Sequence, residues 1–278
     1  YRGFGMCEIH FAIEQNLDMI ASEMGLNAFE MRKLNGIREG GHSATGQTIE
    51  VAGYQECLDR AAALMELDKP CAPSGSPTKL RGKAIAGGWK APSMPTDVAS
   101  SVIIRMNEDG TFILLASCHD IGQGSDTIMA QIAAETLTVP VDKISVRTGD
   151  TDHTPYEWQT VASRSTYCAG NATKLAAEDL RNKVLELAQI KMGTWKNDLY
   201  LENGYVCRKF YPDQKVPLSA FALGLSLPDQ SGIGGPMIGV GAFVVPNNIA
   251  ADKKTGLSPK PVAFWSMGVN GAEVEVDT

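Results

Sequence analysis

The chain has 278 residues, of which 44% are hydrophobic and 21% are charged, and its formal net charge is −7. These values are typical of a folded globular protein and argue against disorder. The negative charge disfavours nucleic acid and anionic membrane surfaces as partners, because both repel an acidic protein. No apolar run approaches the roughly 20 residues that cross a bilayer, so no membrane partner is expected.

The six cysteines are spread singly along the chain. None forms a Cys-x-x-Cys pair, and no histidine stands at zinc-finger spacing from any of them. This spacing disfavours an iron–sulfur cluster or a structural zinc within the chain. It predicts reduced thiols in a cytoplasmic protein.

The first 66 residues are predicted to be mainly helical, with helices over 6–24, 28–35 and 52–66. The apolar residues of the first helix repeat at spacings of three and four, as on one helical face. They are Ile9, Ile13, Leu17, Ile20 and Met24. Pro, Ser and Gly then cluster over 68–78, which is typical of a linker. We therefore expect a domain over 1–66, a linker over 67–80 and a second domain over 81–278.

The second domain mixes strand and helix patterns, which favours an α+β fold over a doubly wound parallel sheet. The expected elements are an alternating strand around 102–106, a turn at 107–110, a returning strand over 111–117, a helix after Ser125, a strand over 144–147, a long helix over roughly 163–192, a hairpin around Asn203–Gly204 and a strand over 262–276. Five glycines over 232–241 predict a loop-rich segment over 228–260.

The segment Asp120-Ile121-Gly122-Gln123-Gly124-Ser125 links a buried strand to a helix. Glycines allow a ligand to approach the backbone, and a helix N-terminus attracts anions. Gln123 adds an amide donor and acceptor. The alternative is a turn that needs positive φ angles, with Gln123 solvated. Asp126 weakens the anion site because it already complements the helix end.

Two further segments could bind a ligand. Ala162-Ser163-Arg164-Ser165-Thr166 combines three hydroxyls and a guanidinium at a helix start, which suits a polyanion. Alternatively, Ser163 is a helix cap and Arg164 a surface charge. In Tyr1-Arg2-Gly3-Phe4-Gly5, Phe4 could form the wall for a planar ligand and Arg2 could bind an anion, or the segment simply leads into a helix. Together these segments predict a glycine-lined cleft for an extended anionic ligand.

The chain resembles the molybdenum-binding subunit of the xanthine dehydrogenase/aldehyde oxidase family of molybdenum hydroxylases. The residues that carry this resemblance are Tyr1-Arg2-Gly3-Phe4-Gly5, Phe11-Ala12, Glu14, Asp18-Met19-Ile20-Ala21, Glu30-Met31-Arg32-Lys33-Leu34-Asn35, Asp120 to Ser125, Thr127, Gln131-Ile132-Ala133-Ala134-Glu135, Gly149-Asp150-Thr151 and Ala162-Ser163. The combination is specific, although no single motif is, and it covers most of the chain.

The resemblance implies the molybdopterin-binding fold of that family, with mixed sheets and packed helices. It implies molybdenum held by molybdopterin, which in some members is the cytosine dinucleotide. Iron–sulfur clusters and FAD would lie on other domains or subunits. The implied reaction oxidises an N-heterocycle such as a purine, or an aldehyde, with water-derived oxygen. The implied partners are the rest of the molybdenum subunit, the iron–sulfur and FAD subunits or domains, and a small-molecule substrate.

The resemblance also implies roles for individual residues. Phe4 and Trp89 would form opposite walls of the substrate pocket. Gln123 and Arg2 would lie near the molybdenum, and no residue of this chain would ligate the metal directly. The residues implied to bind the cofactor are Arg2, Gly3, Gly122, Gln123, Gly124, Ala162, Ser163, Arg164, Ser165 and Thr166.

One departure from the family concerns catalysis. The family's general-base Glu lies in a Gly-Glu-x-Pro loop, which this sequence lacks. We therefore expect a central fragment that lines the cofactor cleft and is inactive alone. Two alternatives remain open: a subunit like that of 4-hydroxybenzoyl-CoA reductase, suggested by Arg164, and a non-catalytic assembly or interaction subunit.

Overall fold

The computed structural model describes residue 3, residues 5–92 and residues 99–278. The chain divides into two compact units. The first combines the described residues up to 92 with Asn247–Thr278, and the second runs from residue 99 to Pro246. The domain boundary expected over 67–80 stays a prediction. No helix in the described ranges is long and apolar enough to span a membrane.

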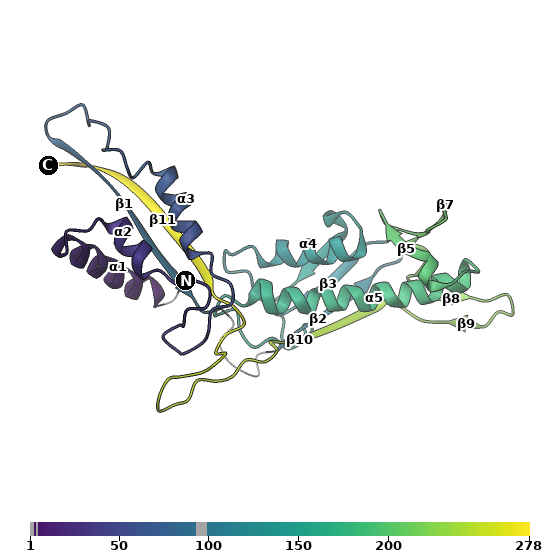
Figure 1. Ribbon diagram of the computed structural model, residues 1–278. Helices are drawn as coiled ribbons and strands as arrows, with labels where there is room; N and C mark the ends of the chain where they lie inside the picture. Colours follow the sequence, from purple (N-terminus) through teal and green to yellow (C-terminus); the bar gives the residue numbers. More distant parts are fainter. Residues whose placement is uncertain (1–2, 4, 93–98) are drawn as a thin grey trace. The chain divides into compact units, whose positions relative to one another are not determined.

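The first unit packs helices against a long two-stranded ribbon (Figure 1). Its elements are α1 (Met6–Glu23), α2 (Ala28–Asn35), α3 (Tyr54–Leu64), β1 (Lys79–Lys90) and β11 (Ser266–Asp277). Strands β1 and β11 pair antiparallel along their whole length. Helix α2 begins with a capping box, in which the Asn27 side chain accepts from the Glu30 backbone N–H at 2.7 Å. The three predicted helices are therefore confirmed.

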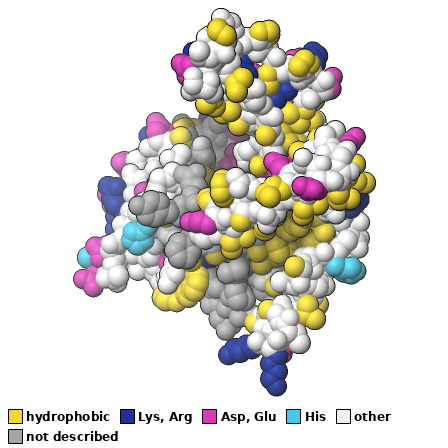
Figure 2. Space-filling model, turned by 90° about the vertical axis from the view of Figure 1, so that its left-hand side faces the viewer, with side chains coloured by type: hydrophobic (Ala, Val, Ile, Leu, Met, Phe, Trp, Pro, Cys, Tyr) yellow, Lys and Arg dark blue, Asp and Glu magenta, His cyan; other side chains and the backbone are white. Residues whose placement is uncertain are grey.

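The predicted apolar face of α1 is not buried within this unit. Ile9 is 54% exposed, Ile13 50% and Met24 64%, whereas Glu14 and Ala21 are buried. Exposed hydrophobic side chains are also visible in the space-filling view (Figure 2). Glu14 is buried because it has partners, which include the guanidinium of Arg32 at 2.7 Å. Periodicity thus predicted the helix correctly but not the face that packs.

The second unit contains a four-stranded sheet and two long helices. Its main elements are β2 (Ala99–Met106), β3 (Phe112–Ala116), α4 (Ser125–Leu137), β4 (Ile144–Arg147), α5 (Gly170–Lys191) and β10 (Ile238–Val244). Its smaller elements are β5 (Leu199–Glu202), β6 (Tyr205–Arg208), β7 (Tyr211–Pro217), β8 (Leu225–Ser226), β9 (Gly232–Ile233) and the short helical turns η1 (Val141–Lys143), η2 (Ser165–Ala169), η3 (Lys196–Asp198) and η4 (Leu218–Phe221).

The main sheet has the strand order β10-β2-β3-β4. Strands β3 and β4 are parallel, and the other neighbours are antiparallel. Alternate residues of β2 and β3 are buried, because one sheet face packs against α4 and α5 (Figure 1). This mixed sheet with packed helices confirms the predicted α+β class. The predicted turn at 107–110 and the hairpin at Asn203–Gly204 are also found, with β7 added to the hairpin.

Strand β10 lies where glycines predicted only loops. Gly239 and Gly241 face α5 at very short range, and a Cβ atom on either would collide with the helix backbone at Ala176 or Ala172. These glycines are therefore close-packing positions within a strand. The small residues of α5 meet them from the other side, so the strand and the helix lie in direct backbone contact.

We predict that Gly241→Ala destabilises the protein by about 1–3 kcal/mol, because the added methyl forces β10 and α5 apart. Chemical unfolding of the purified protein measures this change. Gly232→Ala is the matched control, since a Cβ atom at Gly232 meets nothing within 4 Å. Equal effects of the two substitutions would show that the close approach does not matter.

Candidate functional site

Two of the predicted ligand-binding segments lie at one edge of the main sheet. Strands β3 and β4 are parallel neighbours, paired from Phe112↔Ile144 to Leu115↔Arg147. The chain leaves β3 toward α4 and leaves β4 toward α5, so both connecting loops lie at the carboxyl ends of adjacent strands. That position is where ligands bind in many sheets with parallel strands. We call residues 117–126 and 148–169 the carboxyl-edge site.

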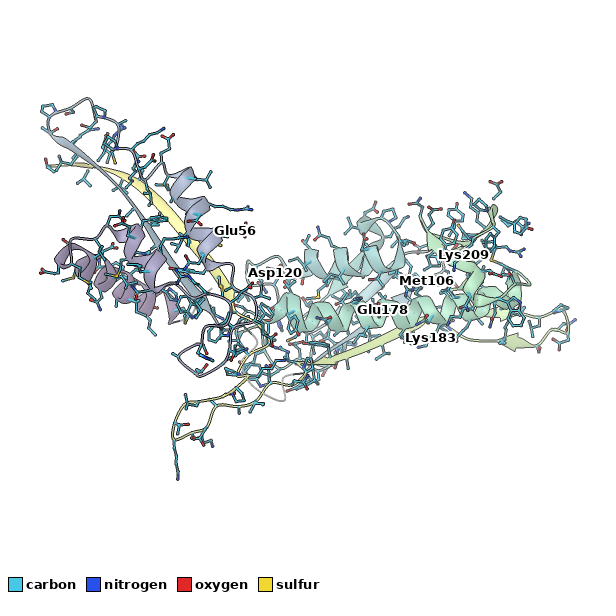
Figure 3. The ribbon with its side chains drawn as sticks, viewed as in Figure 1. Glu56, Met106, Asp120, Glu178, Lys183 and Lys209 are labelled. Atoms are coloured by element: carbon cyan, nitrogen blue, oxygen red, sulfur yellow. The ribbon has the colours of Figure 1, made fainter. Side chains whose placement is uncertain are left out.

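Hydrogen bonds join the two loops. The Ser117 hydroxyl lies 2.6 Å from the Thr154 hydroxyl and donates to the Pro155 carbonyl at 2.6 Å. The Thr160 hydroxyl donates to the His119 carbonyl at 3.3 Å. The segments around Gly122–Gly124 and Ala162–Thr166 therefore belong to one connected assembly. Asp120 marks this end of the second unit, and Lys209 marks the opposite end (Figure 3).

The side chain of Gln123 folds back onto its own loop. Its Oε1 accepts from the Ile121 N–H at 2.6 Å, and its Nε2 donates to the His119 carbonyl at 2.8 Å and to the Ser125 hydroxyl at 3.2 Å. Both ends of the amide are thus engaged, which shapes the loop. A ligand that binds Gln123 must compete with these bonds.

Asp120, which the sequence reasoning did not select, occupies the N-terminus of α4. Its Oδ1 accepts from the Gly122 N–H at 2.8 Å. That bond and those from Gly124, Asp126 and Ser125 lower the pKa of the Asp120 carboxyl, although partial desolvation opposes them. The Asp-x-Gly spacing, typical of an Asx turn, was the available signal.

Asp126 lies in the first turn of α4, as the sequence predicts. Its Oδ1 is buried and has no hydrogen-bond partner among the described residues. Burial, and then the nearby Asp120 charge, raises the pKa of the Asp126 carboxyl, while His119 lowers it. The carboxyl-edge site therefore contains an acceptor oxygen without a donor.

The second loop has an unusual backbone. Ala162 and Ser163 both have φ of 54°, in the left-handed region. A residue other than glycine in this conformation destabilises the folded chain by about 1–2 kcal/mol. The chain then makes a π-helical turn, η2, before α5 begins. Strained residues and π turns are both concentrated at functional sites, which marks this loop independently of its sequence motif.

The predicted cofactor-binding residues in this loop differ in accessibility. Ser163 and Thr166 are exposed, and Ala162 and Ser165 are half-buried. The Arg164 side chain is only 1% exposed and forms an ion pair with Glu157, whose side chain is 3% exposed. Arg164 is therefore neither the surface charge of the simpler interpretation nor an accessible donor.

The remaining predicted residues belong to the first unit. Arg2 and Phe4 lie outside the described residues. Gly3 precedes α1 with a φ of 82°, and its carbonyl accepts from the Met6 N–H at 2.6 Å. Trp89 is half-buried on β1 and packs edge-to-face on Tyr54, with ring centroids 5.4 Å apart. The joint role of these residues with the carboxyl-edge site stays a prediction.

Trp89 lines a cavity of about 720 Å³ between α1 and the β1–β11 ribbon. Glu14 and Arg32 lie at its wall, where Glu14 also accepts from the Gly87 N–H at 2.9 Å. Burial, and then the Glu14 charge, raises the pKa of Tyr54 to about 12. This tyrosine therefore stays protonated at neutral pH. Nowhere in the described ranges do three His, Cys, Asp or Glu side chains gather as a metal site.

We predict that Asp120→Ala lowers the melting temperature at pH 7, because it removes the acceptor at the start of α4. Asp120→Asn, which keeps an acceptor oxygen, should lower it less. Since the folded-state pKa is depressed, the ionised carboxylate stabilises the fold above its unfolded pKa of about 3.9 and ceases to do so as the pH falls through the folded value. The difference between wild type and Asp120→Ala should therefore shrink between pH 7 and more acidic solution. A difference that does not vary with pH would contradict this assignment.

Comparisons with known proteins agree on one family. A family model described as a molybdopterin cofactor-binding domain matches residues 59–278. A xanthine dehydrogenase molybdenum-binding subunit from Escherichia coli is 33% identical over 221 residues, which are 77% of this chain and 29% of that protein. The nicotine 6-hydroxylase large subunit of Paenarthrobacter nicotinovorans is 26% identical over 237 residues, 80% of this chain and 29% of its own length.

Solved structures show the same fold. The aldehyde oxidoreductase from Desulfovibrio gigas matches with a TM-score of 0.75 and 27% identity, over 100% of this chain and 27% of that one. Quinoline 2-oxidoreductase from Pseudomonas putida 86 matches with a TM-score of 0.75 and 21% identity, over 96% of this chain and 34% of that one. The chain thus spans less than a third of the length of the curated relatives described above. The match over residues 59–278 shows that the chain belongs to the molybdopterin-binding domain family of xanthine dehydrogenases and aldehyde oxidoreductases.

Proposed function

We propose that this chain lines the cofactor cleft of a molybdenum hydroxylase that oxidises an N-heterocycle such as a purine, or an aldehyde. The main support is the convergence of the Gly122–Gly124 and Ala162–Thr166 loops at the carboxyl-edge site, in a chain whose family binds molybdopterin. Iron–sulfur and FAD domains or subunits would complete the enzyme. This proposal extends from the chain to a larger protein, because the chain spans only 29% of its xanthine dehydrogenase relative.

The chemistry of the carboxyl-edge site fits a pterin. The buried Oδ1 of Asp126 lacks a donor within the described residues. A pterin ring carries several N–H donors, and its side chain carries a phosphate. The exposed Ser163 and Thr166, next to the start of α5, suit the anionic part of such a ligand.

When bound, the cofactor would supply two-electron oxidation at molybdenum. The chain's own residues would bind and orient it. Gly122 and Gly124 would allow close approach of the ring, and Gln123 would exchange its internal hydrogen bonds for bonds to the group at the metal. Trp89 would contribute an apolar wall for the substrate. The general base would lie outside these 278 residues.

The alternative of a subunit like that of 4-hydroxybenzoyl-CoA reductase depends on Arg164. Because the Arg164 guanidinium is buried and paired with Glu157, no observation favours a reductase of that type. A non-catalytic assembly subunit with a vestigial cleft would carry no molybdenum. The molybdenum content of the intact complex therefore distinguishes such a subunit from part of a molybdenum hydroxylase.

We predict that the intact enzyme contains molybdenum and pterin, and that Gln123→Ala lowers molybdenum content or turnover about tenfold or more, as losses around a metal centre do. Elemental analysis and pterin fluorescence measure the content. Gln189→Ala on α5 is the matched control and should match wild type. Background molybdenum in the wild-type enzyme would overturn the proposed function.

We also predict that the purified 278-residue chain does not oxidise hypoxanthine or aldehydes, since the base and the electron acceptors would lie elsewhere. Steady-state assays with an artificial electron acceptor test this. Turnover above the rate of a heat-treated sample would contradict the proposal.

A further inference from the structure

The buried guanidinium of Arg164 binds several protein acceptors. Besides the ion pair with Glu157, its Nη1 donates to the Gln159 carbonyl at 2.9 Å. Its Nη2 donates to the Ala99 carbonyl at 3.1 Å and to the Ser100 hydroxyl at 2.9 Å. Ser100 and Glu157 also form an isolated antiparallel bridge between their backbones. One side chain thus ties the second loop of the carboxyl-edge site to the start of β2.

This arrangement argues against a direct bond from Arg164 to an anionic ligand. A guanidinium has five N–H donors, and the two Nη atoms face four protein acceptors. The remaining Nε is itself buried, without a partner in the described part of the chain. Reaching a phosphate with Nη1 would require breaking the buried ion pair, which leaves an uncompensated charge, and reaching it with Nη2 would break the bonds to Ala99 and Ser100.

The backbone of Arg164 joins the strained turn to the helix. Its N–H donates to the Val161 carbonyl at 3.3 Å, which closes the left-handed turn of Ala162 and Ser163. Its carbonyl accepts from the Cys168 N–H at 2.6 Å within η2. A left-handed conformation persists only where its surroundings enforce it. Fixing the Arg164 side chain therefore fixes the backbone on both sides of it.

We propose that Arg164 and Glu157 form a buried latch that holds the Ala162–Thr166 backbone in its cofactor-binding shape. Both are positioning residues that act through Ala162, Ser163, Ser165 and Thr166 and do not contact the cofactor. This inference rests on the proposed function only for the identity of the ligand. The shape of the loop depends on the latch with or without that ligand.

The test uses Arg164→Lys, which keeps the charge but loses the forked donors, and Glu157→Gln, which keeps the size but removes the charge. Two quantities are measured in the intact enzyme. The first is amide hydrogen exchange over 157–166 in protein made in a host that cannot synthesise molybdopterin. The second is molybdenum and pterin content in the loaded enzyme.

We expect exchange over 157–166 to become about tenfold faster or more in both variants, because local opening becomes easier. Molybdenum and pterin content should fall about tenfold or more, as for other residues that support a metal site indirectly. Arg105→Lys, an exposed position on β2, should match wild type in both measurements. If Arg164→Lys fails to fold, the amide exchange and the cofactor content of Glu157→Gln alone test whether the latch exists.

Wild-type cofactor content in either folded variant would overturn the latch. Loss of cofactor with unchanged exchange would also overturn it, because that pattern identifies Arg164 as a direct ligand. If the wild-type enzyme holds no molybdenum, the proposed function fails, whereas the exchange rates still decide whether the latch exists.

Discussion

The parallel pairing of β3 with β4 is the constraint on which the carboxyl-edge site depends. Two parallel neighbours require a crossover, which α4 provides, and both strands must then end at the same edge. The loops that carry Gln123 and Ser163 meet for this reason, although 40 positions separate them along the chain. Strand β10, which pairs with β2 on the edge opposite to β3, packs closely against α5 and so helps to fix this sheet on its helices. The sheet thus positions the site, and the loops determine its chemistry.

Within that frame, the two loops are held in different ways. The first is shaped by short-range hydrogen bonds, since Asp120 and Gln123 both bond to backbone groups of their own loop. The second is held by the buried ion pair of Arg164 with Glu157 and by hydrogen bonds from Arg164 to Ala99 and Ser100 of β2. A loop shaped by its own exposed hydrogen bonds can exchange them for bonds to a ligand. A loop fixed by buried charges cannot, so it is suited to present a rigid surface.

Local features of the sequence predicted local structure well. The helix predicted over 28–35 and the turn predicted at 107–110 are both found, because each conformation is encoded within a few residues. Long-range features were not predictable in this way. Strand β1 is rich in glycine and pairs with β11, which lies more than 170 residues later in the chain. No local sequence pattern therefore predicts this pairing. Strand β10 was missed because Gly239 and Gly241 indicate a loop until α5 is seen against them.

For the candidate site, too, the sequence predicted local segments but not the contacts between distant residues. The glycine-flanked Gln123 and the Ser163 segment were predicted to bind a ligand from composition and resemblance. The topology brings the two segments together, and their binding role stays a prediction. The buried contacts of Arg164 were not predictable, because its partners Ala99 and Ser100 lie more than 60 residues away. Asp120 was missed, since only the geometry of the turn shows that its carboxylate accepts from the Gly122 N–H ahead of α4. Contacts at long sequence separation thus limit the prediction of both the fold and the site.

A crystal structure of the molybdenum-loaded enzyme, with anomalous diffraction data collected at the molybdenum absorption edge, tests the central claim most directly. We expect an anomalous peak with pterin density that contacts both the Gly122–Gly124 segment and the Ala162–Thr166 segment, with Arg164 still paired to Glu157. A molybdenum peak whose pterin touches neither segment would contradict it.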